Sequence, residues 1–223
     1  MFRVRPLPPQ VDPALLDLLV KAEPATIGHF RHTGFMDPAI RALRQDVRIA
    51  GTAVTIQAAG PDSTIVHYAL GQVRPGDIMV IDRCGDHKHA ITGGAVIYAA
   101  RKAGVAGVII DGVATDFGEL REYGVPVWCR GTTPITGKML GLGGGFCIPV
   151  SCGGVAVNPG DAIVADENGV LVLPVQDVEA AASRAIAMQK EEREVTLKRL
   201  DAGEKMPDIS GATQIVQSKL APD

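Results

Sequence analysis

Apolar residues follow a helical spacing in the first part of the chain. Residues 15–20 (LLDLLV) give an apolar face directly after Asp12 and Pro13, which have the form of an N-cap followed by proline at the first helical position. A second helix is expected to begin near Thr26. We therefore predict that residues 1–46 form N-terminal helices.

After this region the pattern changes to strands alternating with helices. Short runs rich in apolar and β-branched residues are predicted as strands at residues 49–56, 78–82, 107–111 and 169–174. The Ala-rich segment 93–104 is predicted as a helix, so residues 78–111 should form a right-handed β-α-β unit. The fold class is therefore predicted as α/β, with its core over residues 47–174.

The last part of the chain is more polar. Residues 175–203 are predicted as one long helix with an apolar side, and residues 204–223 as a tail that is either loose or docked on a neighbouring subunit. With its N-terminal helices, α/β core, C-terminal helix and tail, the whole chain 1–223 is expected to be one domain.

Two segments share a short motif. Residues 73–77 (VRPGD) resemble residues 157–161 (VNPGD), and each precedes an apolar run. The likeness indicates either a weak internal repeat or two turns that solve the same local problem.

Composition narrows the class of protein. The 223 residues are 46% hydrophobic and 21% charged, which suits a globular domain with a full core. The formal net charge is -3 and the basic residues are scattered, which argues against a nucleic-acid partner. No apolar run reaches the ~18 residues that a membrane span needs. The N-terminal residues lack the apolar stretch of a signal peptide, so we expect a cytoplasmic protein.

The cysteines do not indicate a zinc site. Cys84, Cys129, Cys147 and Cys152 form no Cys-x-x-Cys pair. A chain of this size does not need disulfides, so free thiols are expected.

A candidate anion site lies at the start of the helix after the second strand. Helix starts present free N–H groups and a partial positive charge, and Gly93 and Gly94 would let a ligand approach the backbone closely. The alternative is that these glycines only fit a tight junction between loop and helix. Asp82 and Asp111 end neighbouring strands on the same edge, where ligands gather in open α/β sheets.

Asp116 and Glu119 form a second candidate. They stand three residues apart, and one or two carboxylates with water suit a hard cation such as Mg²⁺. The same spacing also fits a capping box for a short helix. His67, His87 and His89 cluster in the sequence. His87 and His89, in a polar loop, are interpreted as solvent-exposed or as supporting a metal ligand rather than as ligands themselves. The motifs of serine hydrolases, P-loop NTPases and Rossmann enzymes are missing from the sequence.

Several segments, in order, resemble one known family. They are residues 51–55 (GTAVT), 75–82 (PGDIMVID), 104–112 (GVAGVIIDG), 126–127 (PV), 159–161 (PGD) and 166–170 (DENGV). The set is similar to the 4-hydroxy-4-methyl-2-oxoglutarate / 4-carboxy-4-hydroxy-2-oxoadipate aldolase family, which also contains the regulator of ribonuclease E activity A. The resemblance covers about residues 25–205.

The resemblance implies a compact α/β/β fold of the swivelling-domain type and an assembly of trimers or hexamers with active sites at subunit interfaces. It implies a divalent cation, Mg²⁺ or Mn²⁺, and class II pyruvate aldolase chemistry on a small 2-oxo acid, with oxaloacetate decarboxylation as a related activity. In the family signature, glycine is followed after twenty residues by Arg-Asp and, two residues later, by Glu or Asp. Here the corresponding residues are Gly94, Thr115, Asp116 and Glu119.

The signature assigns roles to residues of this chain. Asp116 corresponds to the metal ligand, and Glu119 is a candidate to support it. Thr115 is expected beside the substrate as a catalytic and binding residue. The substrate carboxylate is expected on the backbone amides of Gly93, Gly94, Ala95 and Val96.

The chain departs from the family pattern at two charged positions. Thr115 replaces the arginine of the signature, and Gly94 replaces a common acidic residue. Loss of one donor to the developing negative charge costs roughly 10²–10³ in rate, and a neutral hydroxyl restores only part of it. Arg83, Lys88, Arg130 or a group from a neighbouring subunit are candidate replacements.

Three functions follow from these patterns. The first is a metal-dependent carbon–carbon lyase that releases pyruvate. The second is a non-catalytic regulator that binds a protein partner, which the missing arginine favours. The third is a small-acid binding protein that has kept the site without the chemistry.

Overall fold

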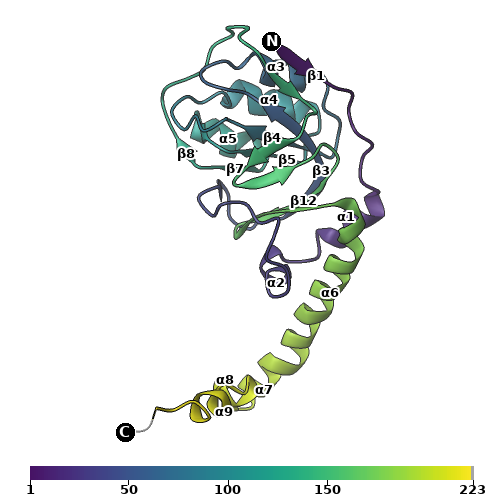
Figure 1. Ribbon diagram of the computed structural model, residues 1–223, viewed down its shortest axis with the longest axis vertical. Helices are drawn as coiled ribbons and strands as arrows, with labels where there is room; N and C mark the ends of the chain where they lie inside the picture. The colour runs from purple at the N-terminus through teal and green to yellow at the C-terminus, as the bar shows by residue number, and fades with distance from the viewer. Residues whose placement is uncertain (222–223) are drawn as a thin grey trace.

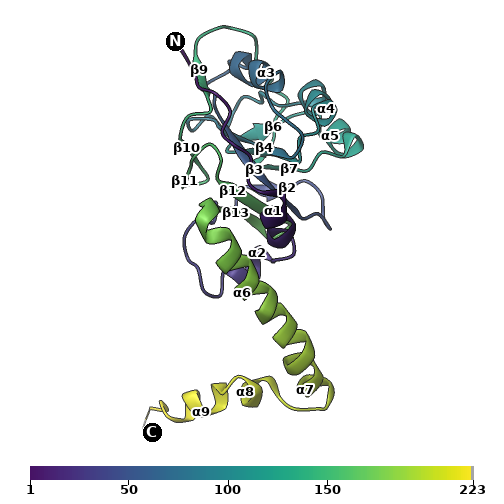
Figure 2. The same cartoon turned by 90° about the vertical axis from the view of Figure 1, so that its right-hand side faces the viewer.

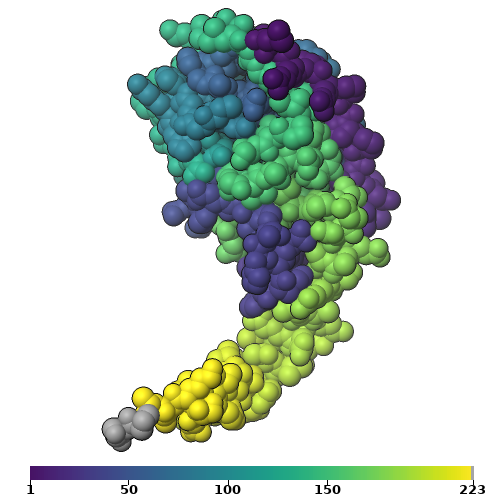
Figure 3. All heavy atoms as spheres, viewed as in Figure 1, coloured from purple at the N-terminus to yellow at the C-terminus, as the bar shows by residue number. Residues whose placement is uncertain are grey.

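The molecule consists of a rounded body and a projecting helical arm. The computed structural model describes residues 1–221. Figures 1 and 2 show the sheet and most helices in the body, and the long helix α6 (Val178–Glu191) leading away from it. Figure 3 shows the arm as a projection from the body, with its yellow part far from the purple N-terminal residues.

The body is built on one mixed sheet. Within the described residues it has nine strands, in the order β1-β9-β3-β4-β5-β7-β2, with β12 beside β3 and β13 beside β12. Its strands are β1 (Phe2–Val4), β2 (Arg41–Ala42), β3 (Ile49–Gln57), β4 (Asp77–Asp82), β5 (Gly107–Ile110), β7 (Val127–Cys129), β9 (Gly144–Phe146), β12 (Ala162–Asp166) and β13 (Gly169–Leu173). Two small two-stranded sheets join β6 (Val113–Ala114) to β8 (Gly131–Thr132) and β10 (Val150–Cys152) to β11 (Val155–Val157).

The helices are mostly short. In chain order they are α1 (Pro13–Leu19), α2 (Pro24–Ile27), α3 (Thr64–Leu70), α4 (Gly94–Lys102), α5 (Phe117–Tyr123), a 3-10 turn η1 (Val175–Asp177), α6, a π-helical segment η2 (Glu192–Thr196), α7 (Leu197–Asp201), α8 (Met206–Ile209) and α9 (Ala212–Gln217).

The side chains of the central strands alternate between the two faces of the sheet and pack into a separate core on each face. Side chains at successive strand positions point to opposite faces of a sheet. Val54, Met79 and Val108 pack with α3, α4 and α5. Ala53 and Ile78 pack with β10, β11, β12 and β13 on the other face. Helices, central sheet and a second β layer therefore form the predicted α/β/β arrangement.

The central β-α-β unit is confirmed. β4 and β5 are parallel neighbours, with Met79 opposite Val108, and α4 connects them. The predicted turns are also matched: the carboxylate of Asp77 accepts the amide of Arg74, and that of Asp161 accepts the amide of Asn158, each at 2.8 Å. The shared motif therefore makes the same turn twice.

The N-terminal region is only partly helical. Asp12 caps α1 as predicted, since its Oδ1 accepts the amide of Ala14 at 2.8 Å. The second helix begins at Pro24 rather than near Thr26. The prediction of helices throughout residues 1–46 is wrong for β1 and β2, which are held by pairing with the distant strands β9 and β7.

The C-terminal region differs in detail from one long helix. The helix of residues 175–203 is divided into η1, α6, η2 and α7, and the tail contains the short helices α8 and α9. The last two residues of the predicted tail, Pro222 and Asp223, lie outside the described residues. Among residues 1–221, no helix is both long and apolar enough to cross a membrane.

Candidate active site

A small hollow lies at the start of α4, between α3, α5 and the loop that follows β8. We call it the α4 hollow. Its volume is about 150 Å³, and it is lined by Ser63, His67, Ala90, Ile91, Gly93, Ala95, Val96, Thr115, Asp116, Thr136 and Gly137. The hollow therefore brings Asp116 together with four other predicted site residues, namely Gly93, Ala95, Val96 and Thr115.

Asp116 has an unusual backbone conformation that aims its side chain across the hollow. It precedes α5 in the left-handed region, with φ 57° and ψ 43°, which is uncommon for a residue with a side chain. Its Oδ2 accepts the amide of Gly94 at 2.9 Å, and its Oδ1 accepts the hydroxyl of Thr115 at 3.3 Å. A non-glycine residue held in this region costs energy and is often found where a site needs it.

The capping-box alternative is wrong. Asp116 occupies the N-cap position of α5 but makes no side-chain cap hydrogen bond to that helix. Its carboxylate instead joins the start of α4 to Thr115. The Asp116 carboxylate therefore holds the start of α4 rather than the start of α5.

The two glycines make room for carboxylates. A Cβ on Gly93 would lie 2.4 Å from Oδ2 of Asp116, and a Cβ on Gly94 would lie 1.6 Å from Oε2 of Glu119. Both distances are below any real contact, so two carboxylates converge on positions 93 and 94. Glycine at position 94 thus allows the Glu119 carboxylate to take the space of a side chain there.

The amides at the start of α4 are partly used. The amide of Gly94 already donates to Asp116. The first amides of a helix have no intrahelical acceptor, and Ala95 and Val96 line the α4 hollow. Of the four residues predicted to hold a carboxylate, only Gly94 donates its amide to Asp116, so the first-turn amides of Ala95 and Val96 remain for a ligand.

The aspartates at the strand ends are engaged elsewhere. Asp82 accepts the amide of Cys84 at 2.7 Å. Asp111 accepts the amide of Gly153 at 2.8 Å and pairs with Arg130. The strand ends therefore support neighbouring loops, and the candidate site begins one segment further along the chain.

Two candidate replacements for the signature arginine are not free. Arg83 is fully buried and donates to the carbonyls of Ala58, Gly60 and His89; its burial lowers its pKa. Arg130 is held by Asp111 and Asp37. Neither arginine lines the α4 hollow, and Lys88 does not line it either.

The histidines separate into two groups. His89 is bound to Asp86, with Nδ1 at 2.8 Å from Oδ2, and neither His87 nor His89 lines the hollow. His67 lines it, together with Ser63 and Thr136. Sequence reasoning did not assign these three residues to the site, because α3 and the loop at 136 reach it only through the tertiary fold.

The donor set at the hollow suits a hard cation. Among residues 1–221 no group of three or more His, Cys, Asp or Glu side chains could together hold a metal ion. Mg²⁺ and similar ions, however, often take only one or two protein carboxylates and keep several waters. Asp116 and Glu119 supply two carboxylates at adjacent positions, so the residues present fit such an ion.

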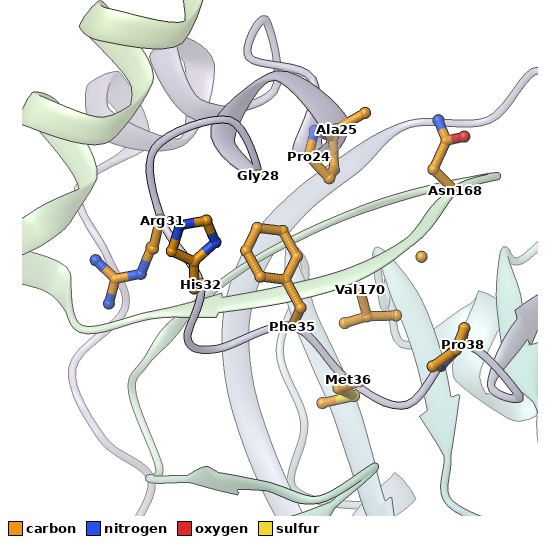
Figure 4. Close-up of a pocket in the computed structure, with 11 residues that line it drawn as sticks. Pro24, Ala25, Gly28, Arg31, His32, Phe35, Met36, Pro38, Asn168 and Val170 are labelled. Atoms are coloured by element: carbon orange, nitrogen blue, oxygen red, sulfur yellow. The ribbon is translucent and has the colours of Figure 1, made fainter. Parts of the chain in front are cut away.

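A larger hollow lies elsewhere on the molecule and has a different character. We call it the Phe35 hollow. Its volume is about 440 Å³, and it is lined by Pro24, Ala25, Gly28, Arg31, His32, Phe35, Met36, Pro38, Asn168, Gly169 and Val170. Figure 4 shows the Phe35 ring in the middle of it, and Arg31 is paired with Asp177 at 3.0 Å. It contains no carboxylate, so we place the candidate active site in the smaller hollow.

Comparison with known proteins agrees with this fold. Residues 15–172 match the RraA-like family, described as Aldolase/RraA. A protein of Halalkalibacterium halodurans named "Putative 4-hydroxy-4-methyl-2-oxoglutarate aldolase" is 37% identical over 153 residues, covering 69% of this chain and 72% of that protein. Protein DlpA of Legionella pneumophila is 30% identical over 162 residues, which are 70% of this chain but only 26% of that protein.

A solved structure is also similar over most of the chain. The crystal structure of Streptomyces coelicolor RraAS2, described as an unusual member of the RNase ES inhibitor RraA protein family, has 29% identity and a TM-score of 0.75. The match covers 87% of this chain and 100% of that one. Sequence and fold therefore lead to the same family.

Proposed function

The chain belongs to the RraA-like family, and from this premise we propose that it is a divalent-metal-dependent carbon–carbon lyase that releases pyruvate from a small 2-oxo acid. The observation that carries the proposal is the strained Asp116, whose carboxylate lies at the start of α4 in space left by Gly93. The aldolase name of the relative from H. halodurans supports the same class of reaction.

Different groups of the candidate site would bind the metal ion and the substrate. Asp116, with Glu119 beside it, would hold Mg²⁺ or Mn²⁺, which when bound supplies Lewis-acid stabilisation of negative charge on the 2-oxo group. The amides of Ala95 and Val96 would bind the substrate carboxylate at the helix start. The Thr115 hydroxyl donates to Asp116 in this structure, and by turning toward the substrate it would donate its one hydrogen bond to the developing charge.

Thr115 sets an expectation for the rate. A neutral hydroxyl stabilises an oxyanion less than the guanidinium of the family signature does. Loss of one such donor costs roughly 10²–10³ in rate. We therefore expect a slow lyase in which the substrate and the metal still bind.

The test is release of pyruvate from oxaloacetate and from 4-hydroxy-4-methyl-2-oxoglutarate. Wild type, Asp116→Asn and the control Asp201→Asn, an exposed carboxylate on α7, would be assayed with Mg²⁺, with Mn²⁺ and with a chelator. We expect metal-dependent release that Asp116→Asn reduces at least about 100-fold and that Asp201→Asn leaves unchanged. Release that survives both the chelator and Asp116→Asn would contradict the proposal.

A second function is favoured by the similarity to RraAS2, which belongs to a family of ribonuclease inhibitors. Wild type that is inert on both substrates with every metal, yet inhibits an RNase E-type ribonuclease, would indicate a regulator. Wild type that is inert but is thermally stabilised by pyruvate and Mg²⁺ would instead indicate a protein that binds small acids.

We also infer that the chain forms a homo-oligomer, as a trimer or hexamer. Large apolar side chains on the arm are 45% to 70% exposed, namely Val195, Leu197, Met206, Ile215, Val216 and Leu220. Exposed apolar surface of this kind is typical of an interface. Light scattering on the full chain would give the assembly mass directly, and a monomer at all concentrations would contradict the inference.

A further inference from the structure

The α4 hollow contains a second ionisable side chain. Among its lining residues, only Asp116 and His67 carry groups that gain or lose a proton in ordinary solution. The other polar side chains there are hydroxyls, from Ser63, Thr115 and Thr136. Asp116, His67 and these hydroxyls are the lining groups that can pass a proton to or from a substrate in this hollow.

Asp116 is poorly placed to move that proton. Both of its carboxylate oxygens accept hydrogen bonds, one from the Gly94 amide and one from the Thr115 hydroxyl. In the proposed function it is also the metal ligand, and a carboxylate that binds a cation is a weak base. His67 is the ionisable side chain that remains.

The helix that carries His67 is firmly held. Asp62, which is 1% exposed, accepts the amides of Thr64 at 3.0 Å, Leu140 at 3.1 Å and Leu142 at 2.6 Å. The amide of Ser63 donates to the carbonyl of Lys138 at 2.9 Å. The start of α3 and the loop beyond Thr136 are thereby locked together, which fixes the backbone of His67.

The imidazole itself is free. Within residues 1–221 the His67 ring makes no hydrogen bond or ion pair with another residue, in contrast to His89, which is bound to Asp86. His67 is also exposed to solvent at the mouth of the hollow. Imidazole exchanges protons readily near neutral pH. A fixed backbone and a ring that no other residue engages leave the imidazole available to exchange a proton with a ligand in the hollow.

We propose that His67 is the general acid–base residue of this site, an inference that rests on the proposed lyase function. In retro-aldol cleavage, neutral His67 takes the proton of the substrate's C4 hydroxyl. The C3–C4 bond breaks, its electron pair goes to C3, and the products are a carbonyl compound and the enolate of pyruvate. The His67 imidazolium then gives the same proton to C3 of the enolate, which forms pyruvate and restores neutral histidine.

Decarboxylation of oxaloacetate uses only half of this cycle. Departure of CO₂ leaves the same enolate without removal of any proton, and the enolate can take its proton from water. A proton-transfer residue therefore matters more for aldol cleavage than for decarboxylation. A residue with a merely structural role would affect both reactions equally.

The experiment compares His67→Gln with wild type on both reactions in the presence of Mg²⁺. We expect aldol cleavage to fall about 100-fold or more, and the ratio of cleavage to decarboxylation to fall at least about tenfold. The matched control is His32→Gln, which changes a histidine of the Phe35 hollow and should alter neither rate. Added imidazole should restore cleavage in His67→Ala but not in Asp116→Ala.

The outcomes distinguish this inference from the function on which it rests. An active wild type that loses activity in Asp116→Asn but keeps it in His67→Gln would overturn only the role of His67, as would an equal fall in both reactions. An inert wild type would overturn both. If wild type decarboxylates without cleaving the aldol, exchange of the pyruvate methyl protons in D₂O decides: His67→Gln must slow the exchange, and an unchanged rate rejects the role.

Discussion

The two hollows differ in size and in what lines them. The Phe35 hollow is nearly three times larger, at about 440 Å³ against about 150 Å³ for the α4 hollow. Its lining is mainly apolar, and its arginine is already paired with Asp177. The α4 hollow is small, but a strained aspartate, free helix amides and an unengaged histidine converge on it.

We infer from this difference that polar groups directed into a hollow, rather than its volume, mark a site for a small polar substrate. A 2-oxo acid of a few carbons needs little space, and its carboxylate and oxo oxygens need donors and a cation. The α4 hollow also contains features that cost stability, such as the left-handed Asp116. None of the non-glycine residues that line the Phe35 hollow has a left-handed backbone conformation.

The largest effect is expected from a single methyl group. Gly93→Ala places a Cβ 2.4 Å from Oδ2 of Asp116, so the carboxylate must move away from the start of α4. A displacement of about 1 Å at a reacting group can cost about 100-fold in rate. We expect this loss in pyruvate release with a small change in melting temperature. Gly28→Ala, in the Phe35 hollow, brings its Cβ 3.1 Å from the carbonyl oxygen of Ala25 and should leave the rate unchanged; equal activity in both variants would contradict the placement of the site.

The next effect is expected on the stability of the fold at Asp62, which holds the start of α3 beside the α4 hollow, and it depends on pH. Burial alone would raise the pKa of Asp62, but hydrogen bonds from Thr64, Leu140 and Leu142 hold it well below the usual value. A depressed pKa stabilises the fold above the unfolded pKa, and this stabilisation is lost as the pH falls toward the folded value. Asp62→Asn should therefore lower the free energy of unfolding by roughly 2 kcal/mol at neutral pH.

The pH dependence provides the check. Urea unfolding at about pH 7 and about pH 3 should show the gap between wild type and Asp62→Asn narrowing at acid pH, because the unfolded wild type takes up a proton at residue 62 and the unfolded variant cannot. The exposed Asp201→Asn should show no such trend. A gap that is constant with pH would mean that the charge of Asp62 does not stabilise the loop.

Local sequence patterns correctly predicted the structural features that depend on residues close together in the chain. The cap at Asp12, the turns at Asp77 and Asp161 and the β-α-β unit each follow from a few adjacent positions, and all are present. The short strands β1 and β2 were missed because three or two residues carry almost no periodic signal. They exist because distant strands supply their hydrogen bonds.

The candidate site was also predicted only in part. The resemblance identified Asp116 and the helix start, and the structure brings these together. It did not indicate His67, which lies almost fifty residues earlier on another helix. It also suggested Arg83 as a free cation, although the fold buries that side chain against three carbonyls. Sequence alone could not show which charged side chains the tertiary structure uses for its own loops.

A moderate effect is expected from restoring a cation. The Phe35 hollow contains an arginine and the α4 hollow contains none. Thr115→Arg therefore tests whether a positive charge in the α4 hollow raises the rate of pyruvate release. A guanidinium at position 115 would make a charge-assisted hydrogen bond to the developing enolate. We expect kcat/KM for pyruvate release to rise about tenfold, because the threonine hydroxyl already supplies part of this stabilisation. Thr136→Arg adds the same charge at another wall of the hollow, and an equal rise there would show that the position does not matter.

The smallest effect is expected at the ion pair beside the Phe35 hollow. The Arg31 and Asp177 side chains are 24% and 39% exposed, and ion pairs of this kind contribute about 0.2–1 kcal/mol. Arg31 also donates to the carbonyl of Thr33 at 3.1 Å, so it should keep its place without its partner. Asp177→Asn should therefore lower the free energy of unfolding by less than about 1 kcal/mol, with a difference that shrinks in high salt and no change in pyruvate release. Because Asp177 also precedes α6, Glu179→Gln in the first turn of the same helix measures the part due to the helix dipole. A fall in lyase activity with Asp177→Asn alone would mean that the Phe35 hollow takes part in the chemistry, and the separation between the two hollows would then be wrong.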